Sequence, residues 1–193
     1  MSDAADLRER VVGSQLVHSG RYLSLRIDTI ERADGTRAAR EIVGHPGAVA
    51  ILALDPDDRV LLVRQWRPAA ERATLEIPAG TLERDDDDSV EDHRLAAARE
   101  LEEETGYRAG RWRHLASFWT APGFASELMH LHLAEELVPA HGDRLGPDED
   151  ERLLLERLPW RDAVAAAEDG TIVDAKSILA LLWLARLRGG GER

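Results

Sequence analysis

Short hydrophobic runs alternate with polar segments along this chain, and their spacing predicts a sheet-rich protein with a few helices. Residues 48–54 are nearly all apolar, which favours a buried strand. Residues 22–31 alternate loosely between apolar and polar positions, which also favours a strand. The other predicted strands cover 11–18, 36–43, 59–66, 75–77, 111–120, 127–134 and 151–158.

Three segments carry the signals of helices. Residues 174–187 are amphipathic and follow Asp174, a residue type that caps helix N-termini. A shorter helix is expected over 160–168, and a third lies within 80–107 and ends at Gly106. The order of strands, helix, strands and helix predicts an α+β sandwich.

The N-terminal part predicts a small antiparallel sheet of its own. Asp34-Gly35 is a good hairpin turn between two predicted strands. A sheet of two or three strands is marginal alone, so it should pack on the main domain or on a second subunit. We therefore divide the chain into N-terminal strands (1–44), a main domain (45–188) and a disordered tail (189–193).

The segment 80–107 is strongly acidic, and three of its carboxylates share one face of the predicted helix. Glu100 and Glu104 are four residues apart, and Glu103 is three from Glu100. Like charges on one face are unfavourable unless a cation offsets them, and Mg²⁺ takes one or two carboxylates plus substrate phosphate oxygens. A solvated acidic face is the alternative. The acidic run at 85–88 is interpreted as a solvated loop rather than a Ca²⁺ site, because the spaced ligands of a calcium loop are missing.

Composition narrows the range of partners. The chain has 193 residues, a net charge of −12 and no cysteine, which excludes disulfides and thiolate zinc sites. An acidic protein is a poor binder of nucleic acid, so a small phosphate ester is the more natural partner. No apolar run is long enough for a membrane span, and the N-terminus lacks the features of a secretory signal. We expect a cytoplasmic protein; the single lysine, Lys176, is interpreted as genomic bias.

The acidic helix resembles the Nudix box, in which glycine, glutamate, Arg-Glu, Glu-Glu and a final glycine follow at fixed spacings. Glu91, Arg99-Glu100, Glu103-Glu104 and Gly106-Tyr107 match that pattern. One departure is that ten residues, rather than five, separate Gly80 from Glu91. The resemblance implies a mixed sheet between helical layers and the hydrolysis of a nucleoside diphosphate linked to another group.

Further residues are similar to the ADP-ribose pyrophosphatase branch of that family. Pro122 lies sixteen residues beyond Gly106, within a loop whose usual aspartate is Ser126 here and whose glutamate is Glu127. The runs 44–50, 63–67 and 75–80 are also similar, so the resemblance covers about residues 11–187.

Carried over to this chain, the resemblance implies a set of site residues. The Ala79 carbonyl, Glu100 and Glu104 would hold Mg²⁺, with Mn²⁺ possible, and Glu103 would hold a second metal or assist the water. Glu127 would be the general base, although Glu103 is an alternative. Arg99 would orient the glutamates by pairing with Glu91 or Glu103. The residues expected to bind substrate are Arg40, Arg67 and Glu76. Trp66 or Tyr22 would stack on the base of the substrate, and a core role is the alternative for each.

The expected reaction is Mg²⁺-dependent hydrolysis of ADP-ribose or a related ADP-sugar to AMP and a sugar phosphate by a homodimer. A hydrolase of GDP-mannose or another nucleotide sugar is one alternative, and a Nudix-fold sensor of ADP-ribose is a second. His130 and His132 share a strand face and could bind metal. Because no third ligand is near in the sequence, we interpret them as a polar sheet face.

Overall fold

The computed structural model describes residues 7–84, 89–141, 145–146 and 152–189, and the chain forms two compact units. One unit is Met1–Gly47 with Trp119–Leu128, and the other is Ala48–Phe118 with Met129–Arg193. The expected acidic loop at 85–88 and all of the expected tail except Gly189 lie outside the described residues.

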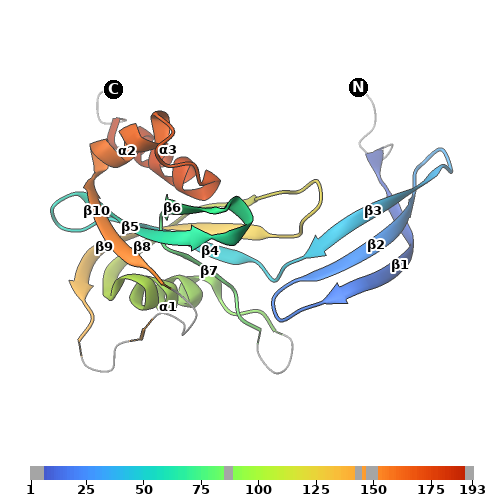
Figure 1. The fold of residues 1–193 in the computed structure, drawn as a ribbon, viewed down its shortest axis with the longest axis horizontal. Helices are drawn as coiled ribbons and strands as arrows, with labels where there is room; N and C mark the ends of the chain where they lie inside the picture. Colours follow the sequence, from blue (N-terminus) through green and yellow to red (C-terminus); the bar gives the residue numbers. More distant parts are fainter. Residues whose placement is uncertain (1–6, 85–88, 142–144, 147–151, 190–193) are drawn as a thin grey trace. The chain divides into compact units, whose positions relative to one another are not determined.

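The first unit contains a three-stranded antiparallel sheet in the order β1-β2-β3, seen in Figure 1. Its strands are β1 (Arg10–Ser19), β2 (Ser24–Glu31) and β3 (Arg37–Gly44). The turn between β2 and β3 has Gly35 at a φ of 81°, and the Thr36 amide donates to the Asp34 carboxylate at 2.9 Å. The small N-terminal sheet expected from the sequence is therefore confirmed.

The second unit holds two further sheets. Strands β7 (Ala79–Thr81), β4 (Ala48–Ala53), β9 (Leu128–Pro139) and β8 (Tyr107–Trp119) form a mixed sheet, in which β4 is antiparallel to β7 and parallel to β9. Strands β10 (Leu154–Pro159), β5 (Arg59–Arg67) and β6 (Arg72–Glu76) form the other, and a 3-10 turn (Pro68–Ala70) precedes β6. Its helices are α1 (His93–Thr105), α2 (Trp160–Glu168) and α3 (Ala175–Gly189).

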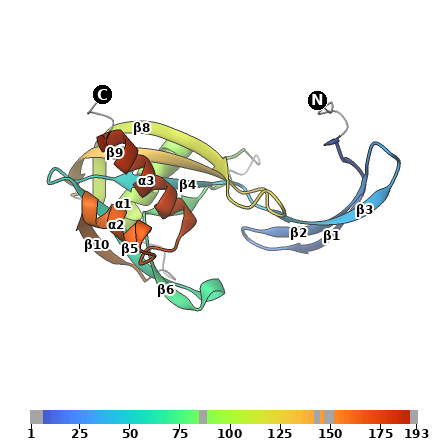
Figure 2. The same ribbon diagram turned by 90° about the horizontal axis from the view of Figure 1, so that it is seen from above.

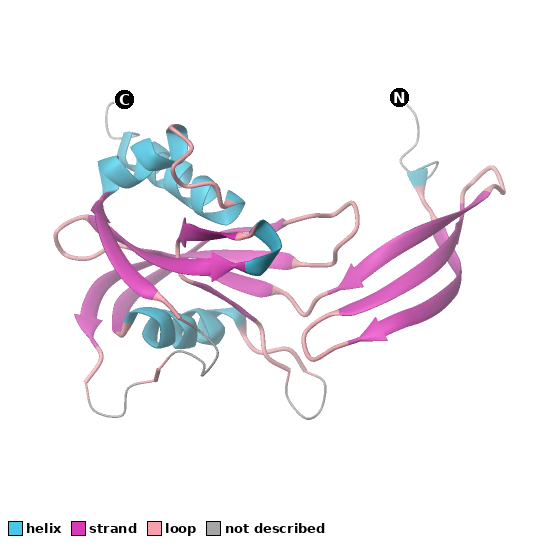
Figure 3. Ribbon diagram, viewed as in Figure 1, coloured by secondary structure: helices cyan, strands magenta, loops and turns pink. Residues whose placement is uncertain are grey.

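Strand β4 is buried along its whole length because helices cover both of its faces. Ala50 and Leu52 belong to the core that receives α2 and α3, whereas Val49 and Ile51 belong to the core that receives α1. Figures 1 and 3 show these helical layers on opposite sides of the strands, and Figure 2 shows α3 crossing over β4. The α+β sandwich with a mixed central sheet is confirmed.

Some element boundaries differ from the sequence-based prediction. Only residues 93–105 of the acidic segment are helical, because Asp92 caps the helix with bonds to the amides of Arg94 and Leu95. Strand β6 ends at Glu76, since the Ile77 amide leaves the sheet to donate to Ser177 at 2.8 Å. None of the described helices has the length and apolar character that a membrane span requires.

Candidate active site

Helix α1 carries the acidic residues on a rigid, docked support. Gly106 ends it in the left-handed region, with a φ of 71°, and its amide bonds back to the Glu102 carbonyl. Ala97 and Leu101 are fully buried in the core that also contains Val49 and Ile51 of β4. The helix therefore cannot rotate without losing that packing, which fixes the direction of its other faces.

The carboxylates of Glu100 and Glu104 lie against the backbone at the start of β7. The Ala79 amide donates to Glu104 Oε2 at 3.0 Å. A β-carbon added at Gly80 would overlap the Glu100 carboxylate, so a residue with a side chain cannot occupy this position without displacing it. Both glutamates are largely buried. Ala79 contacts Glu104 through its amide, whereas the family resemblance implies that its carbonyl binds the metal.

Arg99 gathers three carboxylates around one guanidinium. It contacts Glu91 at 3.0 Å, Glu100 at 2.8 Å and Glu103 at 2.9 Å, as the sequence predicts for Glu91 and Glu103. Burial alone would lower the pKa of Arg99, but the hydrogen bonds to Glu91 and the neighbouring negative charges outweigh it and raise that pKa. Arg99 is therefore a fixed cation that orients the glutamates.

The enlarged loop before α1 leaves Glu91 in reach of Arg99. Glu83 and Glu91 are bonded through the backbone at 3.0 Å, and Arg84 and Val90 form an antiparallel bridge. These contacts close the base of the loop, so extra residues between them do not shift Glu91. The ten-residue spacing is thus accommodated without moving the partner of Arg99.

The carboxylate oxygens of Glu100 and Glu104 suit a hard cation such as Mg²⁺. The close fit between Gly80 and Glu100 keeps the Glu100 carboxylate next to the backbone. Among the described residues, no three acidic or histidine side chains already converge as a complete metal cage. Mg²⁺ typically binds through one or two carboxylates together with substrate phosphates. Glu100 and Glu104 fit that mode of binding.

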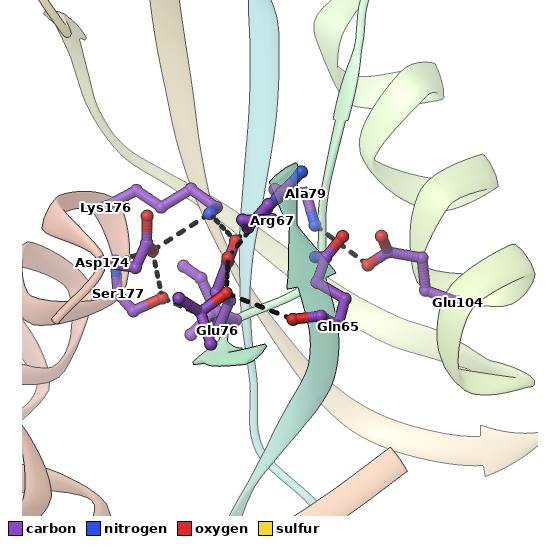
Figure 4. A network of polar contacts seen from close by, with 10 residues as sticks. Gln65, Arg67, Glu76, Ala79, Glu104, Asp174, Lys176 and Ser177 are labelled. Carbon is purple, nitrogen blue, oxygen red and sulfur yellow. Dashed lines mark hydrogen bonds and ion pairs between the residues drawn. The ribbon is translucent and has the colours of Figure 1, made fainter. Parts of the chain in front are cut away.

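A second polar cluster, shown in Figure 4, surrounds Glu76, whose exposed fraction is only 2%. Arg67 donates to both oxygens of Glu76 at 2.9 and 2.7 Å, and Lys176 forms an ion pair with the same carboxylate. Burial raises the pKa of Glu76, but these cations outweigh it and hold that pKa at about 2. Glu76 is therefore a buried, ionised carboxylate that pairs with Arg67.

The N-terminus of α3 holds the segment that leads to Ala79. Asp174 accepts from Lys176 at 3.0 Å and from the Ser177 amide at 3.0 Å, and Ser177 Oγ accepts from the Ile77 amide. Sequence reasoning missed Lys176 and Ser177. A single lysine at the start of an apolar helix was the available signal, because burying it requires anionic partners.

Arg40 and Glu127 belong to the unit of the three-stranded sheet. Arg40 pairs with Glu9 at 2.5 Å, and Glu127 accepts from Thr120 Oγ1 at 2.5 Å. His45 Nε2 lies 3.6 Å from Glu127. Trp66 and Tyr22, which are 62% and 50% exposed, are not core residues.

The interpretation of His130 and His132 as a polar sheet face is wrong for His132, which is 1% exposed. Two histidines from other elements lie beside them: His93 Nδ1 is 3.0 Å from His132 Nε2, and the His114 ring is 5.3 Å from that of His132. The Nδ1 of His132 is buried without a hydrogen-bond partner. Four of the seven histidines thus meet next to the first turn of α1.

Acidification is expected to destabilise this part of the fold. Burial and the nearby His93 and His114 lower the pKa of His132 to about 4 from 6.5. The unfolded chain therefore binds the proton first, so stability present above pH 6.5 is lost as the pH falls towards 4. The full loss, reached below pH 4, amounts to about 3 kcal/mol, of which about 2 kcal/mol falls between pH 7.5 and 5.0. Urea unfolding of the wild type and of His132→Leu at these two pH values measures the latter part.

The variant should show a smaller change in unfolding free energy between the two pH values than the wild type. His141→Leu, at an exposed position, is the matched control and should keep the wild-type change. Equal changes in the wild type and in His132→Leu would show that another group causes the acid sensitivity.

The helical layers, the mixed sheet and the acidic helix against Gly80 together define a fold of the Nudix type. The family model for the NUDIX domain matches residues 44–181, and the chain belongs to that family.

Individual relatives cover nearly the whole chain. The ADP-ribose pyrophosphatase of Bacillus subtilis is 39% identical over 178 residues, which are 92% of this chain and 93% of the relative. The methanol dehydrogenase activator of Bacillus methanolicus is also 39% identical, over 91% of this chain and 92% of the relative. A crystal structure of an ADP compounds hydrolase aligns with a TM-score of 0.80 and 26% identity, covering 96% of this chain and 97% of that one.

Proposed function

We propose that this protein catalyses the Mg²⁺-dependent hydrolysis of ADP-ribose or a related ADP-sugar, giving AMP and a sugar phosphate. The observation that carries the proposal is the placement of Glu100 and Glu104 against the backbone of Ala79 and Gly80. The similarity to an ADP-ribose pyrophosphatase and to an ADP compounds hydrolase supports the choice of substrate.

Glu100, Glu104 and the Ala79 carbonyl are the proposed ligands of Mg²⁺, for which Mn²⁺ is a chemical substitute. Glu103 is assigned to a second ion or to the water. A bound divalent ion would neutralise charge on the phosphate oxygens and lower the pKa of a bound water. Arg99 keeps Glu100 and Glu103 separated and directed, because it contacts both of them.

In the proposed reaction, water attacks one phosphorus of the diphosphate while the bond from that phosphorus to the bridging oxygen breaks. Glu127 takes the proton of the water, and the departing phosphate leaves with the bridging oxygen. Glu103 is the alternative base. The products carry one phosphate each, which are AMP and the sugar phosphate when the substrate is an ADP-sugar.

Arg67 and Arg40 are the proposed partners of the diphosphate, because a guanidinium binds phosphate oxygens in pairs. The Arg67 side chain is 43% exposed and Glu76 orients it from the buried side. Because Glu76 is buried, we propose that it contributes to substrate binding indirectly, by holding Arg67 in position.

We also propose a homodimer in the cytoplasm. Several apolar residues of the three-stranded sheet and its flanks are exposed, including Leu16, Val17 and Leu23. A second copy of the chain would cover them, because such a sheet is marginal by itself. Without cysteine the chain needs no oxidising compartment, and its negative charge argues against nucleic acid as a partner.

Product analysis on ADP-ribose, GDP-mannose, NADH and diadenosine polyphosphates, with Mg²⁺ or with EDTA, tests the proposal. We expect AMP and ribose phosphate from ADP-ribose as the fastest reaction, lost in EDTA. Faster release of GMP from GDP-mannose would support the nucleotide-sugar alternative. Tight binding of ADP-ribose without hydrolysis would support a sensor, although the box residues Glu100, Glu103 and Glu104 are all present.

A further inference from the structure

The ring of His45 has a fixed arrangement of its two nitrogens. Its Nδ1 accepts a hydrogen bond from the Gly47 amide at 3.0 Å. An amide can only donate, so Nδ1 is unprotonated and a neutral ring must carry its hydrogen on Nε2. Burial lowers the pKa of His45 despite the opposing effect of the Glu127 charge, which favours this neutral form.

The protonated nitrogen faces the carboxylate of Glu127. His45 Nε2 lies 3.6 Å from Glu127 Oε1, slightly beyond a hydrogen bond, and Thr120 Oγ1 donates to Oε2 at 2.5 Å. The carboxylate therefore lies between two donors, one directed at each oxygen. The negative charge of Glu127 acts in turn on the His45 ring and opposes the lowering of its pKa by burial.

One side-chain and two backbone hydrogen bonds hold the loop of Glu127 to the strand that leads into His45. Ser126 Oγ accepts from the His45 amide at 2.9 Å, and the Ser126 amide donates to the Val43 carbonyl at 3.0 Å. The Val43 amide donates to the Phe124 carbonyl at 2.7 Å. The serine in place of the usual aspartate thus ties the two segments, and His45 and Glu127 are held as one piece.

We propose that His45 is a positioning residue that directs the Glu127 carboxylate. The inference rests on the proposed function, in which Glu127 takes the proton of the attacking water. His45 Nε2 faces Oε1 and Thr120 Oγ1 bonds to Oε2, so the two neighbours together set the direction of the carboxylate. With Nδ1 occupied and Nε2 protonated, neutral His45 does not compete for that proton.

Two substitutions separate the roles of the two nitrogens. His45→Asn places an oxygen near Nδ1 and keeps an acceptor for Gly47, but it has no donor near Glu127. His45→Gln reaches the position of Nε2 with an amide donor, but it loses the acceptor. We expect His45→Asn to lower kcat about tenfold, with KM within about twofold. His45→Gln should keep a kcat close to that of the wild type.

A purely structural role of His45 predicts the opposite order, because the turn at Gly47 would suffer more in His45→Gln. A wild-type kcat for His45→Asn, or a lower kcat in His45→Gln than in His45→Asn, would overturn the inference. His141→Asn, at an exposed position, is the control and should leave kcat and KM unchanged.

A measurement independent of catalysis keeps this inference separate from the proposed function. Nitrogen-15 NMR of the imidazoles should show the Nε2–H tautomer for His45, and Glu127→Gln should lower the pKa of His45, since the Glu127 charge raises it. An Nδ1–H tautomer would refute the inference even in an enzyme that hydrolyses ADP-ribose. Failure to hydrolyse any tested substrate would refute the proposed function and leave the tautomer result intact.

Discussion

Replacing Glu104 with glutamine is expected to reduce Mg²⁺-dependent turnover at least about a thousandfold while the protein still folds. Glutamine has nearly the same shape and keeps an oxygen that can accept from the Ala79 amide, so the contact at 3.0 Å survives. It carries no charge, however, and a neutral amide is a much weaker ligand of Mg²⁺ than a carboxylate. Initial rates across a Mg²⁺ titration, together with urea unfolding, measure both expectations.

Glu102→Gln is the matched control for this experiment. Glu102 lies on the same helix and is as buried as Glu104, but it pairs with Arg108 at 2.6 Å and with the Leu145 amide at 3.2 Å. Its substitution should lower stability and retain turnover. Normal turnover in Glu104→Gln would remove Glu104 from the proposed metal ligands.

Gly80→Ala is expected to lower turnover about a hundredfold and to weaken the apparent affinity for Mg²⁺. The new methyl group would occupy the space of the Glu100 carboxylate. That carboxylate would have to move, which would also break its contact with Arg99 at 2.8 Å. The overlap should lower the unfolding free energy by about 1–3 kcal/mol. Gly146→Ala, where no atom lies near the added carbon, should change neither quantity.

A double substitution tests whether the overlap is the cause. Glu100→Ala in the Gly80→Ala background removes the carboxylate that the methyl group displaces. Stability should then recover relative to Gly80→Ala, whereas turnover should not. If stability does not recover, strain elsewhere around residue 80 causes the loss, and the close fit between Gly80 and Glu100 is not the reason for a glycine here.

The parts of the site that the sequence could predict are those that depend on local spacing. The end of α1 at Gly106 and the pairing of Arg99 with Glu103 follow from the period of a helix and from a glycine stop. The start of α1 does not follow from the sequence, because four aspartates precede Asp92 and aspartate is a residue type that caps helices.

Contacts between distant segments were not available from local patterns. Lys176 lies one hundred residues from Glu76, and no local pattern joins them. His93 and His114 reach His132 only because α1 docks on the sheet that contains β8 and β9. The parallel pairing of β4 with β9 also joins distant segments. Its register depends on how both helical layers pack, so no local pattern predicts it.

The burial of Lys176 gives the protein an internal probe for chemical labelling. Its ammonium group is the only side-chain amine of the molecule, and the residue is 8% exposed. Amine-reactive reagents should therefore modify Lys176 only when the start of α3 opens. The rate of that modification, followed by mass spectrometry, would report the opening of α3 without any engineered tag.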